Sequence, residues 1–224
     1  MGNTDHMSAT DEGQCSHTYA VCFSGGSGSR YGRRLVEVLL RSGHCVHLCA
    51  TNAAVRVLKH EEGQDLDLDS PELASLFDED LQSKLHVHAL ASVEAAPASG
   101  SAGIDATIVV PCSMGTLARI AHGFSSNLVE RAADVAIKEG RPLIVVPRET
   151  PLSEIHLENM LKLVRMGVVV LPAMPGFYQR PQSIAELVDF VVGKILDRLG
   201  VPHELVARWQ TPQSESPWDE GEVT

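Results

Sequence analysis

The chain has 224 residues, of which 44% are hydrophobic, 21% are charged and 4% are aromatic. This composition is too apolar for a wholly disordered protein, and no apolar run approaches the roughly 20 residues that a membrane span requires. The net charge is -11, yet the segments 1–18, 61–83 and 211–224 hold 3, 9 and 4 of the acidic residues and no Lys or Arg. The rest of the chain is mildly basic, which suits a small phosphorylated ligand. The few aromatic residues and the lack of a dense Lys/Arg stripe argue against a nucleic-acid surface.

Residues 1–18 contain no Lys or Arg and no apolar run, so they match neither a secretory signal nor an Arg-rich transit peptide. We therefore expect a cytoplasmic protein. The length predicts one large domain with tails. We expect a disordered tail over 1–18, a single domain over 19–210 and an acidic tail over 211–224.

Apolar runs alternate with amphipathic stretches in chain order. Strands are predicted at 19–24, 45–50, 106–110, 142–147 and 168–171. Helices are predicted after 25–29, from Thr51 towards His60, on both sides of 124–127, over 153–166 and from Ser183 to Leu199. The acidic stretch 61–80 is expected to be mostly solvated, with a short helix after Pro71. Because the strands are apolar throughout, we predict an α/β fold: a single doubly wound parallel sheet of the Rossmann or flavodoxin type, sandwiched by helices.

In such a fold the ligand lies beyond the carboxyl ends of the strands. Those ends carry Ser24–Gly28, Thr51, Ser113–Thr116, Arg148–Glu149 and Phe177–Tyr178. The first of these is a glycine-rich turn between a strand and a helix, which lets backbone N–H groups approach a phosphate. Its spacing matches neither GxGxxG nor a P-loop, and a plain tight turn is an equally good interpretation of it. A second such loop at Ser113–Thr116 makes a phosphorylated or flavin-like ligand the better interpretation.

Four basic residues are candidates for a phosphate clamp. Arg131 and Lys138 are seven residues apart on a predicted helix, hence on one face, while Arg148 follows a strand and Lys194 lies on the last helix. Taken alone, each of these residues fits a solvated surface charge better than a ligand. Together they offer both forked and point-charge donors to a phosphate. Glu149, between two prolines at a strand end, is either a simple loop carboxylate or a group for proton transfer.

The cysteines and histidines show no metal-ligand spacing. The chain has five cysteines, with no CxxC pair, and ten histidines, of which His86 and His88 alternate along a strand-like run. We expect no metal site. The cysteines are predicted to be free, buried thiols: Cys15, Cys22, Cys45, Cys49 and Cys112.

Seven segments resemble the UbiX family, in family order and spacing, over roughly residues 19–210. They are 24–32 (SGGSGSRYG), 111–117 (PCSMGTL), 127–138 (NLVERAADVAIK), 141–151 (RPLIVVPRETP), 155–160 (IHLENM), 175–182 (PGFYQRPQ) and 189–194 (DFVVGK). The family comprises flavin prenyltransferases. They join the dimethylallyl group of dimethylallyl monophosphate to N5 and C6 of reduced FMN, and the prenylated FMN serves UbiD-type decarboxylases. The resemblance implies a metal-independent enzyme and a homo-oligomer, typically a dodecamer with active sites at subunit junctions.

The resemblance also implies roles for individual residues. The residues it assigns to FMN are Gly25, Gly26, Ser27, Thr51, Ser113, Met114, Gly115, Thr116 and Arg148. Those it assigns to the substrate phosphate are Arg131, Lys138, Arg148, Tyr178 and Lys194. It makes Glu149 the acid/base carboxylate, Ser27 a proton-handling hydroxyl, Trp209 the aromatic ring near the prenyl group and Glu61 a carboxylate that helps to close the site. By position alone, a Trp near a tail such as Trp209 is more often a packing anchor or an oligomer contact than a catalytic group.

The sequence departs from the family pattern at four positions. Gly26 stands where Ala is common, Arg30 where smaller residues are frequent, Thr51 where Ser is usual and Lys194 where Arg is also found. None of these changes removes a chemical role, although Lys194 replaces a forked donor by a single charge.

Two other functions remain open. An FMN-dependent peptidyl-cysteine decarboxylase would use a catalytic His and a Pro-x-Met-Asn motif, whereas the matching stretch here, Ala173–Tyr178, has no Asn. A non-catalytic flavin-binding subunit of a decarboxylase would be signalled by loss of Glu149 or of the phosphate donors, and both are present.

Overall fold

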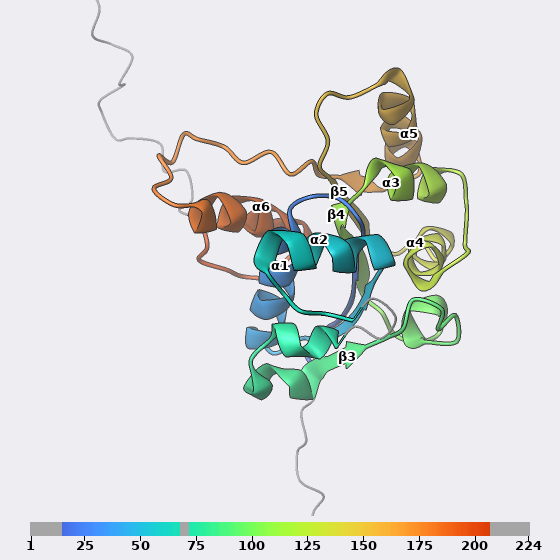
Figure 1. Cartoon of the computed structure of the whole chain (residues 1–224). Coiled ribbons are helices and arrows are strands. Elements are labelled where there is room, and N and C mark those ends of the chain that lie inside the picture. The colour runs from blue at the N-terminus through green and yellow to red at the C-terminus, as the bar shows by residue number, and fades with distance from the viewer. Residues whose placement is uncertain (1–14, 68–71, 207–224) are drawn as a thin grey trace, which may run out of the picture.

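The computed structural model describes residues 15–67 and 72–206, and these form one parallel sheet with helices on both faces (Figure 1). The six strands are ordered β3-β2-β1-β4-β5-β6, and every neighbouring pair is parallel. Their bounds are β1 Thr18–Phe23, β2 Cys45–Ala50, β3 Leu85–Val87, β4 Ala106–Cys112, β5 Leu143–Pro147 and β6 Val169–Val170. The predicted doubly wound α/β fold is confirmed.

The helices divide between the two faces of the sheet. Their bounds are α1 Ser29–Arg41, α2 Asn52–Glu62, α3 Met114–Ala121, α4 Leu128–Lys138, α5 Glu154–Arg165 and α6 Ile184–Leu199, and short 3₁₀ turns cover Leu73–Leu76, Glu79–Lys84 and Ala96–Ala98. In Figure 1, α1, α2 and α6 lie on one side and α3, α4 and α5 on the other. Successive strand residues point to opposite faces, so Val21 packs towards α1 and Cys22 towards α4, and both are fully buried. This double burial explains why the strands are apolar at every position.

Most helices begin at a side-chain cap. The hydroxyl or amide oxygens of Thr51, Ser113, Asn127, Ser153 and Ser183 accept hydrogen bonds from backbone N–H groups three residues later. Each such cap stabilises its helix by about 1 kcal/mol. Helix α1 differs, because its N-cap is Gly28, in the left-handed region with φ 103° and with no side chain to donate or accept.

The acidic stretch after α2 is more buried than the sequence predicts. Glu61 and Glu62 belong to α2 itself, and the side chains of Leu66, Leu73 and Phe77 join the core on the α1 face. The prediction of a mostly solvated segment was wrong because apolar residues scattered among the acidic ones fold inwards. Of the carboxylates, Asp65, Asp67, Glu72 and those of 78–80 are exposed, while Glu61 and Glu62 are partly buried. The short helix expected after Pro71 is present as the 3₁₀ turn Leu73–Leu76.

Two of the five cysteines are paired, contrary to the prediction of free thiols. Cys15 and Cys45 form a disulfide, with Cα atoms 5.5 Å apart. The residues after Cys15 continue alongside the start of β2, since Ser16 N–H donates to Gly43 O (3.3 Å) and Cys45 N–H donates to His17 O (2.9 Å). This pairing depends on the register of β1 against β2, which the sequence does not display.

The other three cysteines are free and buried, as predicted. Cys22 and Cys49 are register partners on β1 and β2, and their sulfurs lie 3.4 Å apart. The hydrogen bond with Cys22, together with burial, raises the pKa of Cys49, and burial raises the pKa of Cys112. Cys49 and Cys112 therefore stay protonated at neutral pH and are poor nucleophiles.

A non-reducing peptide digest of protein purified without reductant should link Cys15 to Cys45, while Cys22, Cys49 and Cys112 should alkylate only after denaturation. Because the bond closes a loop with a sequence separation of 30, Cys15→Ser should lower the free energy of unfolding by about 2–4 kcal/mol. An unlinked, freely alkylated Cys15 in that digest would refute the pairing.

Candidate functional site

The glycine-rich loop after β1 is held against the beginnings of two helices. A Cβ atom on Gly25 would lie 2.6 Å from the Cβ of Ala53, in the first turn of α2. A Cβ atom on Gly26 would lie 3.3 Å from both Pro111 Cβ and the backbone N of Ser113, immediately before α3. The loop therefore needs glycine at position 25 for close packing, and its backbone lies where the N-termini of α2 and α3 converge.

Ser24 ties this loop to the second one. Its hydroxyl donates to Pro111 O (3.0 Å) and accepts from Ser113 N–H (2.7 Å), and the residue is fully buried. In the second loop Ser113 Oγ donates to Thr116 Oγ1 (3.0 Å). Ser24 was predicted to lie at the end of a strand, but no role was assigned to it. A serine at the end of an otherwise apolar strand was the sequence signal that could have indicated a polar contact there.

The loops form a cradle for an anion. Parallel strands place the N-termini of the helices that follow β1, β2 and β4 at one edge of the sheet. The first-turn N–H groups of α2 and α3 point out of this edge, and helix N-termini favour phosphate. The cradle thus fits a phosphorylated cofactor such as FMN, with Gly25, Gly26, Ser27, Thr51 and Ser113–Thr116 around it.

Glu61 caps α1 from the end of α2. Its carboxylate accepts from the N–H groups of Gly28 (3.0 Å) and Ser29 (2.9 Å) and from the Ser29 hydroxyl (2.8 Å). Burial acts to raise the pKa of Glu61, but hydrogen bonds from Ser27, Ser29 and Gly28 outweigh it and hold the pKa below its usual value. The carboxylate is therefore ionised at neutral pH and supplies the cap that Gly28 cannot. In the sequence, a Glu in the last turn of one helix does not indicate that it caps another helix.

Arg148 and Glu149 follow β5 at the same edge of the sheet. Arg148 is exposed, and its charge acts on Tyr31 in the first turn of α1: burial raises the pKa of Tyr31, and Arg148 partly offsets that effect. Glu149 is half-buried, with one carboxylate oxygen accepting from Thr150 N–H (3.0 Å). The structure therefore brings Arg148 to the side of the cradle formed by α1.

Lys138 does not join the cradle within one chain. Helix α4 runs from the carboxyl edge of the sheet back to the amino edge, over about 15 Å. Its last residue, Lys138, pairs with Glu139 (3.1 Å), and Glu139 packs on Gly100 in the loop that leads into β4. Lys138 therefore lies at the edge of the sheet opposite Ser27. Arg131, one turn into α4, is half-buried, with its guanidinium 3.9 Å from Asp134.

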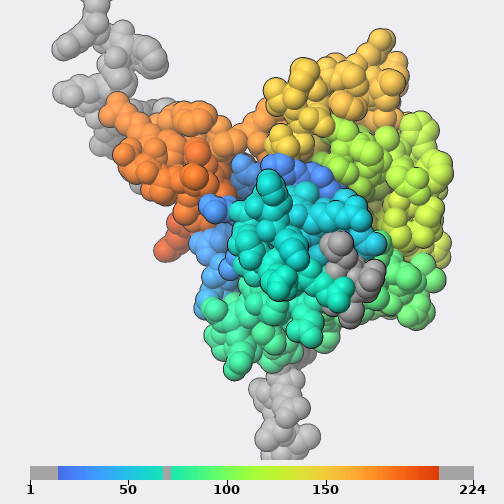
Figure 2. Space-filling view, viewed as in Figure 1, coloured from blue at the N-terminus to red at the C-terminus, as the bar shows by residue number. Residues whose placement is uncertain are grey.

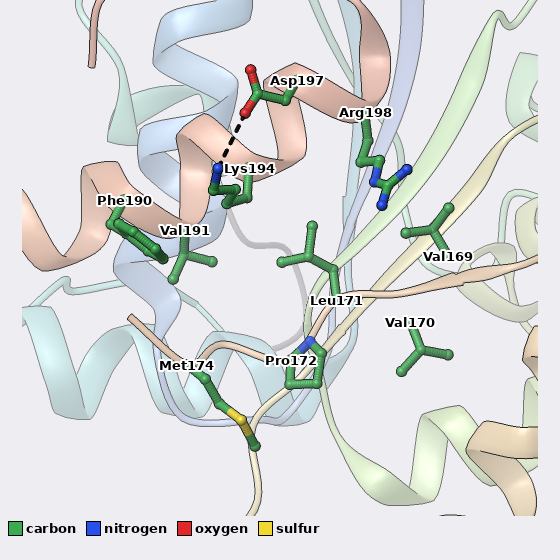
Figure 3. Close-up of a pocket in the computed structure, with 10 residues that line it drawn as sticks. All are labelled: Val169, Val170, Leu171, Pro172, Met174, Phe190, Val191, Lys194, Asp197 and Arg198. Atoms are coloured by element: carbon green, nitrogen blue, oxygen red, sulfur yellow. Dashed lines mark ion pairs between the residues drawn. The ribbon is translucent and has the colours of Figure 1, made fainter. Parts of the chain in front are cut away.

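Lys194 lines a cavity of about 530 Å³ between β6 and α6 (Figure 3), and Tyr178 contacts the Phe190 ring, which lines the same cavity. The cavity has apolar walls and a charged rim, and it is lined by Val169, Val170, Leu171, Pro172, Met174, Phe190, Val191, Lys194, Asp197 and Arg198. The Phe190 ring contacts Tyr178 edge-on at 5.8 Å and lies 5.9 Å from Lys194 Nζ. Trp209 lies outside the described residues.

Within residues 15–67 and 72–206, no group of three or more His, Cys, Asp or Glu side chains could hold a metal ion. Three histidines lie close together at the sheet edge, where His47 Nδ1 lies 2.8 Å from His88 Nε2 and the His47 ring stacks on His86. Burial, followed by the charges of His86 and His88, lowers the pKa of His47 to about 4. In the same part of the chain, no helix has the length and apolar character needed to cross a membrane.

Comparison with known proteins identifies close relatives. The model of the Flavoprotein family matches residues 7–196. The flavin prenyltransferase UbiX of Alkalihalophilus pseudofirmus is 51% identical over 84% of this chain and 94% of its own length. The structure of AnUbiX (PadA1) in complex with FMN and dimethylallyl pyrophosphate has a TM-score of 0.77 at 36% identity, over 88% of this chain and 99% of that one. A dodecameric FMN-dependent UbiX-like decarboxylase from Escherichia coli O157:H7 has a TM-score of 0.74 at 40% identity, over 87% and 100%.

More distant structures share only the fold. An FMN-dependent cysteine decarboxylase of thioviridamide biosynthesis has a TM-score of 0.52 at 22% identity, over 69% of this chain and 89% of that one. The similarity to this cysteine decarboxylase therefore carries no argument about activity.

The close packing at Gly25 gives a test of the cradle. Gly25→Ala should lower the affinity for FMN at least tenfold, because the new Cβ would lie 2.6 Å from that of Ala53 and must displace the loop. Titration of FMN fluorescence measures the affinity, and Ala53→Gly alone serves as the control for the cost of a helical glycine. The double variant Gly25→Ala/Ala53→Gly should recover most of the affinity; equal loss in the single and double variants would contradict the packing argument.

Proposed function

The chain belongs to the UbiX family of flavin prenyltransferases, and from that membership we propose that it joins the dimethylallyl group of dimethylallyl monophosphate to N5 and C6 of reduced FMN, releasing phosphate. The observation that carries the proposal is the cradle of two loops and two helix N-termini, with Arg148 at its side, in a chain 51% identical to such an enzyme. The prenylated FMN is the product, and a UbiD-type decarboxylase is its recipient.

We assign FMN binding to the residues of the cradle. The glycines admit the flavin to the backbone, the hydroxyls of Thr51 and Ser113 cap the helices whose N–H groups face the phosphate, and Arg148 adds a charge. Reduced FMN supplies the two atoms to which the five-carbon group is joined. Ser27, whose hydroxyl bonds to the ionised Glu61, is positioned by that contact to handle a proton.

The phosphate donors are assigned to a site that more than one copy of the chain completes. Within one chain Lys138 lies at the opposite edge of the sheet from Ser27, and Tyr178 and Lys194 lie beside α6. A homo-oligomer places such residues of neighbouring copies against one cradle. The similarity to the dodecameric Escherichia coli protein supports this arrangement.

The cationic side chains and Glu149 have different roles: the cations stabilise negative charge, and Glu149 transfers protons. Breaking the allylic C–O bond leaves a phosphate dianion, and Arg131, Lys138, Arg148 and Lys194 stabilise that charge as it develops, without a metal. An aromatic ring against the allylic cation, the role proposed for Trp209, would contribute about 1–2 kcal/mol. Closing the ring removes one proton from N5 and one from C6 of the flavin, returns one to the central alkene carbon of the prenyl group and leaves one for the departing phosphate, and Glu149 relays these protons.

We propose a cytoplasmic location, in line with the absence of a membrane-crossing helix among the described residues. In that reducing compartment Cys15 and Cys45 would be held as thiols, and their bond would form after exposure to air.

The activity can be tested by incubating the protein anaerobically with reduced FMN and dimethylallyl monophosphate and measuring the mass of the released flavin by mass spectrometry. We expect a flavin heavier by one C5H8 unit, formed equally well in the presence of a chelator. The diphosphate should be tried in parallel. Unchanged FMN with both substrates would reject the prenyltransferase and favour the thiol-oxidising or non-catalytic flavin proteins.

In the same assay Glu149→Gln should lower kcat by about 100-fold or more, since general acid–base groups contribute rates of that order. FMN affinity should be unchanged, because the amide keeps the shape and the contact with Thr150 N–H. A variant with full kcat would remove Glu149 from proton transfer.

The outer face of α5 gives a test of assembly. Leu157, Leu161 and Val164 follow one another at helical spacing and are about half exposed, and α5 stands at the rim of the molecule (Figure 2). An apolar stripe of this kind marks a protein interface. Leu161→Glu should convert the oligomer to smaller species in light scattering and abolish activity, while Lys162→Glu on the same helix should not; an intact oligomer in Leu161→Glu would place the interface elsewhere.

A further inference from the structure

We infer that Asp197 and His203 are positioning residues for Lys194, fixing its ammonium group at the mouth of the cavity beside α6. The inference rests on the proposed function, in which Lys194 binds the substrate phosphate. Neither residue belongs to the motifs that resemble the UbiX family.

Lys194 is confined from two sides. Its Nζ lies 3.6 Å from Asp197 Oδ2, three residues further along the same face of α6, as the dashed line in Figure 3 marks. The Phe190 ring lies on the other side, 5.9 Å from Nζ, and its contact with Tyr178 joins the two proposed phosphate ligands. A lysine ammonium is a point charge on a flexible four-carbon stem, so its direction is set by such neighbours.

Asp197 is itself held in place by His203. Leu205 N–H donates to His203 Nδ1 (3.3 Å), so Nδ1 carries no proton in the neutral ring. The proton is then on Nε2, which lies 3.3 Å from Asp197 Oδ1 and donates to it. The carboxylate thus has one oxygen on the imidazole and the other facing the lysine.

The imidazole is fixed by packing. Its side chain is only 10% exposed, against 54% for Asp197, and its Cε1 lies 3.0 Å from where a Cβ on Gly193 would be. The ring occupies the space that a side chain at position 193 would fill, so the segment after α6 is pressed onto the helix. An exposed carboxylate that would otherwise rotate freely is therefore anchored through a nearly buried ring.

The loose distance between Lys194 and Asp197 is consistent with a positioning role. At 3.6 Å the ammonium is guided without being fully engaged, and its remaining N–H groups are available to a phosphate oxygen. Asp197 limits the directions that the lysine samples before the substrate arrives, which lowers the cost of ordering it on binding.

The test compares variants of the full-length protein in the prenyl-transfer assay. Asp197→Asn should raise KM for dimethylallyl monophosphate by about two- to fivefold, the effect of losing an exposed ion pair, with kcat and the KM for FMN unchanged. His203→Asn, which keeps an acceptor for Leu205 N–H but loses the donor to Asp197, should act in the same direction. His203→Gln, which keeps a donor near Nε2, should act less. Glu204→Gln removes an adjacent negative charge and is the matched control.

A second measurement does not depend on activity. The rate of acetylation of Lys194, followed by peptide mass analysis, should rise in Asp197→Asn and His203→Asn and stay at the wild-type rate in Glu204→Gln. An unchanged or lower KM in Asp197→Asn, equal effects in Glu204→Gln, or unchanged acetylation would each overturn the inference. If the wild type transfers no prenyl group, the proposed function fails and the acetylation rates alone decide whether Lys194 is positioned as described.

Discussion

The site depends on the close approach of the glycine-rich loop to the first turns of α2 and α3. At Gly25 there is no room for a single further carbon beside Ala53, and Ser24 closes the arrangement by bonding both to Pro111 O and to Ser113 N–H. The contact brings two helix N-termini to one point. Without it the sheet would still form from its apolar strands, but the partial positive charges of the helices would be too far apart to act on one phosphate.

The parallel sheet explains both what one chain provides and what it lacks. Every strand delivers its following loop to the carboxyl edge, so residues from β1, β2, β4 and β5 meet there although they are far apart in sequence. The return helices carry their last residues to the other edge, and for that reason Lys138 is separated from Ser27. An enzyme of this fold that uses the far end of α4 needs a neighbouring copy to supply it.

The sequence was sufficient for the fold and for the location of the cradle. Strands buried on both faces show as continuous apolar runs, and caps such as Thr51 and Ser183 mark where helices begin, because these signals are local. The contacts that were predicted wrongly or not predicted at all join residues that are far apart in the sequence. The Cys15–Cys45 pairing needs the strand register, the burial of Leu66 and Phe77 needs the α1 face to be in place, and the capping of α1 by Glu61 joins residues about thirty positions apart.

Helix α2 contacts the same loop at both of its ends and so fixes the spacing between two points of that loop. At its start Ala53 touches Gly25, and at its end Glu61 holds Gly28 and Ser29. Its length and rotational phase are therefore set by the loop rather than by the acidic segment that follows it. One residue inserted within α2 would turn Glu61 by about 100° about the helix axis and remove the cap.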